Sequence, residues 1–304
     1  SNCGVAMNAY TRWTACGWVI PGLLFSAAAI ADPDHANPNQ DVIGQDAKSL
    51  PLFDAHMHYK RPIWDALPPD KVLSFMDRNG VAMALVSSSP DEGTITLWEH
   101  APKRIVPEMR PYNDQLGQHN WTRGEGVWEM IGQRVRLYPH EGIGEFHLHR
   151  VDPNDHALLK NIVALAMEKN IPLHVHSGHE PIEFLYSIDP GLTIIWAHAG
   201  MSEPADVVEH MMERYPTLYA DTSYRELDIL TVDEKGIDTK WKQVLERFSD
   251  RFMVGSDTWS NSQWAEYDNL IGINRETRPD PKRGGYLFEF MIKPKPVGPP
   301  GARR

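Results

Sequence analysis

The chain has 304 residues, of which 41% are hydrophobic and 23% are charged, a composition typical of a globular protein. Its formal net charge is −11 and it has no run of Lys or Arg, which argues against a nucleic-acid partner, because phosphate binding needs clustered positive charge. The two cysteines, Cys3 and Cys16, both lie among the first 31 residues, so disulfides and cysteine chemistry are excluded from the rest of the chain.

The first 31 residues have the pattern of a secretory signal peptide. Arg12 supplies a small basic region, residues 15–30 are mostly apolar or small, and a small-x-small cleavage pattern ends at Ala31. The apolar stretch is short and broken for a membrane span, and an N-terminal anchor that stays attached is the alternative. We therefore predict a periplasmic or secreted protein that has no membrane contact after cleavage.

Residues 51–292 alternate short apolar runs with helical patterns, between a polar linker predicted for 32–50 and a flexible tail predicted for 293–304. Amphipathic patterns predict helices over 71–79, 154–169, 203–214, 240–248 and 263–275. The predicted strands are 52–56, 81–87, 104–109, 142–147, 172–176, 193–198, 218–223 and 252–256. Strands separated by helices imply parallel pairing, and this number of units in about 250 residues predicts a (β/α)8 TIM barrel. A doubly wound open sheet is the alternative, but no glycine-rich phosphate fingerprint follows the first strand.

Side chains that bind metals or transfer protons stand at the ends of several predicted strands. Residues two apart in a strand share a face, so His56 and His58, at the end of the first strand, would project together with Asp54 below them. Active sites of (β/α)8 barrels lie at the C-terminal ends of the strands. We therefore expect one site to collect the other strand-end side chains as well: Glu145, His174, His176, His198 and Asp257.

Three imidazoles and a carboxylate leave one open coordination position, as a catalytic zinc site requires. A metal in such a site lowers the pKa of a bound water towards about 7. Asp257 could take the proton of that water, and His198 could steady the developing oxyanion. Zinc is the first expectation, although Mn or Fe would accept the same nitrogen and oxygen ligands.

Five motifs, in the order DAHMH, GIGEF, IPLHVHSG, WAHAG and VGSDTW, span residues 54–259 and resemble those of the amidohydrolase superfamily, in its amidohydrolase 2 branch. The resemblance implies that His56, His58 and His176 are metal ligands. It implies that Asp257 touches both metal and water, and that His198 orients the water and substrate. Glu145 stays open between a ligand, which in some relatives bridges two ions, and a structural or substrate-contacting residue. The sequence therefore implies one metal ion or two.

Four residues are candidates for substrate binding. Arg110 and Arg225, near the ends of the third and seventh predicted strands, could each hold a substrate carboxylate or form an ordinary ion pair. His174 could be a ligand, a hydrogen-bond donor to one, a residue lining the pocket, or packing in the barrel interior. Trp259 could form an apolar wall of the pocket or simply pack.

These features predict an exported metal-dependent hydrolase that cleaves an amide, ester or lactone bond in a small molecule. A non-oxidative decarboxylase of the same superfamily is the alternative, which an arginine lining the pocket would favour. A metal-binding protein without turnover is a third hypothesis, against which the intact Asp257 and His198 argue. The sequence leaves the substrate and any self-association into a homo-oligomer open.

Overall fold

The computed structural model of the chain describes residues 51–229 and 238–276. The signal peptide predicted for residues 1–31, the linker predicted for 32–50 and the tail predicted for 293–304 lie outside the described residues. Within the described part of the chain, no helix has the length and apolar character needed to cross a membrane.

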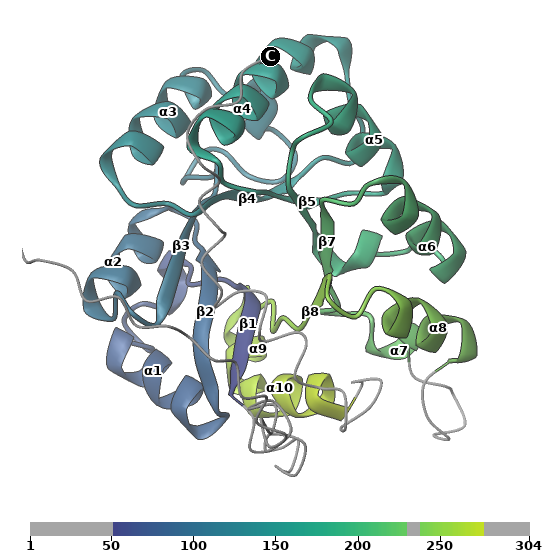
Figure 1. Cartoon of the computed structure of the whole chain (residues 1–304). Coiled ribbons are helices and arrows are strands. Elements are labelled where there is room, and N and C mark those ends of the chain that lie inside the picture. Colours follow the sequence, from purple (N-terminus) through teal and green to yellow (C-terminus); the bar gives the residue numbers. More distant parts are fainter. Residues whose placement is uncertain (1–50, 230–237, 277–304) are drawn as a thin grey trace, which may run out of the picture. The chain divides into compact units, whose positions relative to one another are not determined.

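Parallel strands form the sheet, and they follow one another in chain order (Figure 1). Between the first and the last of them, the Ala55 amide donates to the Val254 carbonyl at 2.8 Å, so the sheet closes on itself. The predicted (β/α)8 barrel is thereby confirmed. The strands are β1 (Leu52–Met57), β2 (Val81–Ser87), β3 (Ile105–Met109), β4 (Gly142–His147), β5 (Leu173–His176), β6 (Ile194–Trp196), β7 (Leu218–Asp221) and β8 (Phe252–Met253).

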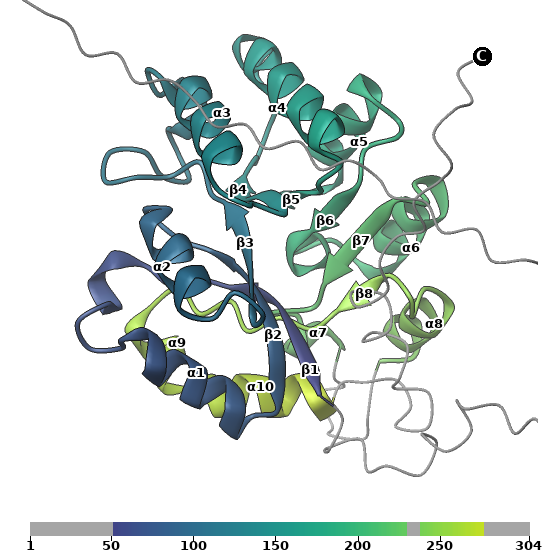
Figure 2. The ribbon, with the colours of Figure 1, turned by 60° about the vertical axis from the view of Figure 1, so that its left-hand side comes forward.

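Helices surround the strands on the outside of the barrel, as the views of Figures 1 and 2 agree. Four of the predicted helices are present with ends shifted by at most two residues, whereas the pattern over 263–275 is two helices that meet at Glu266. The described helices are α1 (Pro69–Arg78), α2 (Glu92–His100), α3 (Val127–Leu137), α4 (His156–Lys169), α5 (His179–Ile188), α6 (Ala205–Arg214), α7 (Glu226–Ile229), α8 (Thr239–Arg247), α9 (Asn261–Ala265) and α10 (Tyr267–Glu276).

The barrel interior changes from apolar to polar along the strands. Phe53 packs with Leu85, Ile195 and Met253 in an interior cluster, and each of these residues precedes the polar residues at the end of its own strand. Histidines and carboxylates take over at the C-terminal ends, where they are buried as well. The apolar cluster therefore closes the barrel below the polar site and leaves that site open at one end only.

The first strand does not alternate regularly. Asp54 accepts hydrogen bonds from the Ser256 hydroxyl at 2.6 Å and the Tyr267 hydroxyl at 3.1 Å. It therefore faces α10 and, contrary to the prediction, does not lie on the face of His56 and His58. The register between β1 and β2 shifts between Asp54 and Met57. Such an irregularity re-aims a side chain. It brings His56 to the interior although Asp54, two residues earlier, points outward.

Candidate metal centre

Three buried histidines each use one ring nitrogen to donate a hydrogen bond at the wall of the barrel. An Nδ1 atom that faces a carbonyl or carboxylate oxygen must carry the hydrogen, so the Nε2 atom of the same ring offers its lone pair. The Nδ1 donations run from His56 to Asp221 Oδ2 (3.2 Å), from His58 to the Ser87 carbonyl (2.6 Å) and from His198 to the Ser223 carbonyl (3.0 Å).

The Nε2 atoms of His56 and His58 lie 3.2 Å apart, and each residue is 1% exposed. Two lone pairs at that distance repel each other unless a proton or a metal ion lies between them. Asp257 Oδ1 adds a negative oxygen 3.1 Å from His58 Nε2 and 3.5 Å from His56 Nε2. Imidazole and carboxylate donors gathered in this way fit a divalent transition metal.

Glu145, near the end of β4, divides its two carboxylate oxygens between two groups of histidines. Oε2 lies 3.3 Å from His58 Nε2 and 3.6 Å from His56 Nε2. Oε1 lies 2.7 Å from His176 Nδ1 and 3.6 Å from His198 Nε2. The carboxylate therefore stands between a pair of histidines from β1 and a pair from β5 and the segment after β6.

The charges of the site attract a cation. Burial alone would lower the pKa of His56, but the carboxylates of Asp257 and Asp221 more than compensate and raise that pKa well above its usual value. Burial would raise the pKa of Glu145, yet His56 and Arg110 hold it well below its usual range. The field that draws a proton to His56 Nε2 also draws a divalent metal, which would displace that proton.

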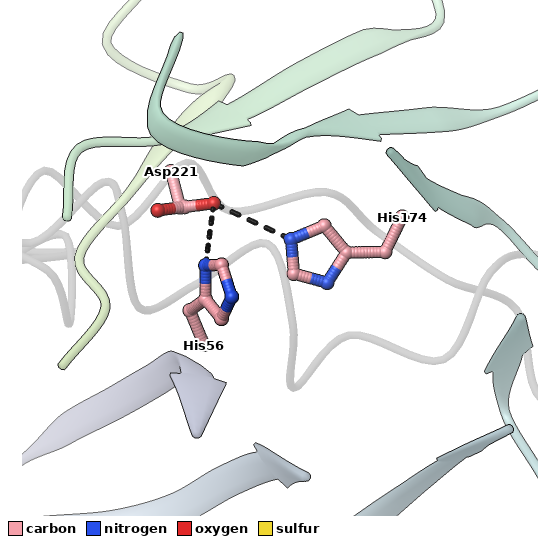
Figure 3. Close-up of side chains that lie close together, drawn as sticks. All are labelled: His56, His174 and Asp221. Carbon is pink, nitrogen blue, oxygen red and sulfur yellow. Dashed lines mark hydrogen bonds and ion pairs between the residues drawn. The ribbon is translucent and has the colours of Figure 1, made fainter. Parts of the chain in front are cut away.

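A second layer of charged side chains lies beneath the first. Figure 3 shows His174 of this layer together with Asp221 and His56, the residue of the upper layer that Asp221 contacts. His174 contacts Glu108 Oε2 through Nδ1 at 3.0 Å and Asp221 Oδ2 through Nε2 at 3.4 Å. Burial would lower its pKa, but these carboxylates raise the pKa of His174 to about 9. With both nitrogens donating, His174 has no lone pair for a metal.

Asp221 and Glu108 are site residues that the sequence analysis missed. Asp221 accepts from both His56 and His174 (Figure 3). Its Oδ1 atom also accepts from the Ser223 hydroxyl at 2.5 Å. A signal for Asp221 existed, because it ends β7 just as the other polar residues end their strands. Glu108 precedes the end of β3 and carried no such signal.

The backbone is left-handed at two of the predicted catalytic residues. His198 has φ 56° and Asp257 has φ 45°, in the region that residues other than glycine seldom adopt. Arg225 holds the segment that contains His198, since it donates to the carbonyls of His198 at 3.1 Å and Ala199 at 3.0 Å. Its remaining donors reach the Glu203 carbonyl and Asp228. Arg225 is therefore committed to the protein chain.

A cavity of about 700 Å³ opens above the centre. Two of the residues predicted to bind substrate, Arg110 and Trp259, line this cavity. The other two, His174 and Arg225, are not part of its wall as the structure describes it. Arg110 donates to Glu145 twice, to Oε2 at 2.7 Å and to the backbone carbonyl at 2.9 Å. The predicted ligands and proton-transfer residues that reach the cavity are His58, Glu145, His176, His198 and Asp257.

His147, the last residue of the predicted strand 142–147, also lines the cavity. Its ring stacks on that of His176 with centroids 4.1 Å apart. The Tyr112 hydroxyl accepts from the His147 amide at 2.8 Å and lies 2.9 Å from Nδ1 of the same residue. Because the hydroxyl has one hydrogen left to donate, it donates to Nδ1, and His147 presents an Nε2–H group to the cavity.

Comparison with known proteins gives structural relatives only: neither protein-family models nor curated protein sequences match. One solved structure comes from the engineering of organophosphate hydrolysis from a weak promiscuous lactonase template; it is 14% identical, with a TM-score of 0.50 over 81% of this chain and 93% of the other. A protein described as a 2-pyrone-4,6-dicarboxylic acid hydrolase from Pseudomonas putida is 16% identical, with a TM-score of 0.49 over 80% and 99%. A mutant organophosphorus hydrolase from Deinococcus radiodurans is 13% identical, with a TM-score of 0.49 over 81% and 91%. At these identities the comparisons bear on the fold alone.

Proposed function

We propose that the protein is a metal-dependent hydrolase that cleaves an amide, ester or lactone bond in a small molecule. The observation that carries the proposal is the convergence of histidine Nε2 lone pairs and two carboxylates at the floor of a cavity, each ring fixed by a hydrogen bond from its other nitrogen. The motif resemblance to the amidohydrolase superfamily supports the same class of reaction.

The donor set divides in a way that suits two ions, with Glu145 between them. His56, His58 and Asp257 would hold one ion. His176 and His198, whose ring centroids lie 4.7 Å apart, would hold the other. One oxygen of Glu145 faces each group. Zinc is the metal we propose first, because imidazole and carboxylate ligands in a partly open site are its usual catalytic environment.

A bound divalent metal supplies Lewis-acid polarisation of a carbonyl group and activation of water at neutral pH. Asp257 lines the cavity, and with Oδ1 against the β1 histidines its Oδ2 atom, 3.8 Å from His198 Nε2, is placed to accept a proton from water. The same carboxyl group then returns that proton to the leaving group. Arg110 holds Glu145 in place and so positions the centre without touching the reacting atoms.

The decarboxylase alternative rests on one observation, which is that Arg110 lines the cavity. A decarboxylase of this kind would use a guanidinium group to grip the substrate carboxylate. Because Arg110 already donates to Glu145 through two nitrogens, the hydrolase is the better supported of the two activities.

The test counts metal ions and products together. Elemental analysis of the purified protein is expected to give about two transition-metal ions per chain, and His58→Ala is expected to lose at least one of them and about 10³-fold or more of the activity on a panel of esters and lactones. His100→Ala, which alters an exposed histidine paired with Asp70, is the matched control. Glu145→Gln tests whether Glu145 bridges two ions, because a bridging role predicts that this variant loses one of them.

Wild type that binds no metal under any loading condition would overturn the proposal. Release of CO2 without release of acid from an ester or lactone would replace the hydrolase with the decarboxylase. A count of one ion, unchanged in Glu145→Gln, would remove the bridge and leave a mononuclear site.

Export is a separate part of the proposal and rests on the signal-like pattern of residues 1–31. Expression with and without these residues in a bacterium that has a periplasm tests it. The full chain should be recovered from the periplasmic fraction and begin at Asp32, whereas the truncated chain should stay in the cytoplasm.

A further inference from the structure

Lys60 is a cavity residue that the metal centre does not use. It follows β1 in extended conformation, with φ −83° and ψ 153°, so its side chain and that of Tyr59 point to opposite sides. Tyr59 is buried and donates its hydroxyl to the Leu67 carbonyl at 2.8 Å, which fixes this part of the chain. Lys60 is thereby turned into the cavity, which it lines together with His58 and Asp257.

The Lys60 ammonium has no carboxylate within ion-pair distance among the residues that the structure describes. The ammonium lies over the Trp259 ring, whose centroid is 5.3 Å from Nζ. Arg110, the other cation of the cavity wall, is instead paired with Glu145 at 2.7 Å. A partly buried cation without a partner is costly, and it is usually compensated by a ligand or a counter-ion.

Metal binding sharpens this imbalance. The negative charges that act on Lys60 are those of Asp257 and Glu145, which are both candidate ligands. A divalent ion would neutralise these carboxylates, so the loaded cavity would carry net positive charge, with Lys60 as its uncommitted cation. A cavity with that charge favours an anionic molecule over a neutral one of the same shape.

We propose that Lys60 binds a free carboxylate on the substrate, so that the protein hydrolyses small acyl compounds that carry a second, anionic group. This inference rests on the proposed hydrolase function and names its substrate class. A single ammonium group suits a singly charged carboxylate better than a doubly charged phosphate. Among the described residues of the cavity wall, the other Lys or Arg side chain is Arg110, which is already paired with Glu145.

The mouth of the cavity suits the rest of such a molecule. Met201, Tyr224 and Trp259 line it and are among the large hydrophobic side chains that are exposed, Trp259 by 51%. Exposed apolar groups that cluster at a cavity usually contact a ligand. The substrate would then place its carboxylate on Lys60 and its apolar part against these three side chains.

The experiment uses metal-loaded protein and two esters that differ in one charge, 4-nitrophenyl hydrogen glutarate and its methyl ester. Wild type is expected to prefer the anionic ester in kcat/KM, and Lys60→Met is expected to lower the anionic-to-neutral ratio by about 10- to 100-fold, as for loss of a charged hydrogen bond. Lys60→Arg should keep most of the ratio. Lys103→Met, at an exposed lysine away from the cavity, should leave it unchanged.

Calorimetric titration with glutarate gives a readout that does not depend on turnover. Its affinity for the loaded protein should fall by a similar factor in Lys60→Met and stay unchanged in Lys103→Met. A wild type without preference for the anionic ester, or a preference and affinity that survive in Lys60→Met, would overturn the role of Lys60. If neither ester is hydrolysed but glutarate binding depends on Lys60, the carboxylate site stands and the hydrolase proposal fails.

Discussion

Two layers of histidines lie one above the other in the barrel, and they are built for opposite purposes. In the upper layer His56, His58 and His198 each donate through Nδ1 to one acceptor, which leaves Nε2 available. In the lower layer His174 is held between Glu108 and Asp221 and donates through both nitrogens. His56 and His174 are ring neighbours, with centroids 4.6 Å apart, yet only His56 can bind a metal.

The difference lies in what the second nitrogen of each ring faces. Nε2 of His56 and Nε2 of His58 face each other and Asp257, a group of donors in which a metal can displace a proton, whereas both nitrogens of His174 are held by Glu108 and Asp221, which favour a charged imidazolium that is a structural cation. Asp221 serves both layers, because its Oδ2 atom accepts from His56 above and from His174 below. We therefore expect substitutions in the lower layer mainly to lower the free energy of unfolding. Substitution of the shared carboxylate, Asp221, should mainly weaken metal binding.

The largest effect on stability is expected for His174→Leu. The substitution leaves Glu108 and Asp221 buried without their cation, and loss of one partner from a buried ion pair costs about 3–5 kcal/mol. Urea unfolding of the wild type and the variant measures the change in the free energy of unfolding. His100→Leu, at an exposed histidine, should change it by no more than about 0.5 kcal/mol. A loss below about 1 kcal/mol in His174→Leu would show that His174 is not the cation of the lower layer.

A smaller effect, on metal affinity, is expected for Asp221→Asn. The amide still fills the space, but it no longer attracts the hydrogen of His56 Nδ1 with a full charge, so the ring is oriented less firmly. Loss of such a supporting group typically weakens metal binding by 10- to 100-fold. Competition with a chelator measures the affinity, and Asp77→Asn, at an exposed carboxylate paired with Arg104, is the control. Equal affinities in both variants would mean that Asp221 supports only the lower layer.

The smallest effect is expected at His179. Its Nδ1 atom lies 2.7 Å from Glu203 Oε1, as close as the histidine–carboxylate contacts of the core, but its side chain is 38% exposed. The hydrogen bond to Glu203 raises the pKa of His179. This contact therefore stabilises the fold fully below the unfolded-state pKa of about 6.5, and the contribution is lost as the pH rises through the folded-state pKa.

Solvent screening limits the value of this exposed contact to less than about 1 kcal/mol. The difference in unfolding free energy between wild type and His179→Gln should be measurable at pH 6 and should shrink at pH 9. A difference that grows with pH would contradict the assigned direction of the pKa shift. The comparison with His174→Leu then shows what burial adds to the same kind of contact.

The barrel was predictable because its strands are short apolar runs with clear ends. The bounds of β2 and β4 are the predicted ones, and those of the long helix α4 differ by two residues at one end. Helices α2, α3, α5 and α7 were not predicted. Strand β6 is shorter than predicted because the chain turns at Ala197 into a short helical segment that ends at Gly200.

The candidate site was only half predictable for a related reason. Strand ends indicate which residues meet, so the predicted ligands are brought into one region of the structure. Strand ends do not indicate which acceptors face each ring, and that difference separates His174 from His176. It depends on Glu108 and Asp221, which come from other strands, 66 and 47 residues away from His174.

The left-handed backbone at His198 and Asp257 has a consequence for the stability of the whole molecule. Such a conformation costs about 1–3 kcal/mol at a residue with a side chain and almost nothing at glycine. Glycine at either position would relieve this strain in the main chain and remove a group that the chemistry requires. A laboratory selection for heat resistance alone would therefore tend to erode the active site, and only a selection that also demands turnover would preserve it.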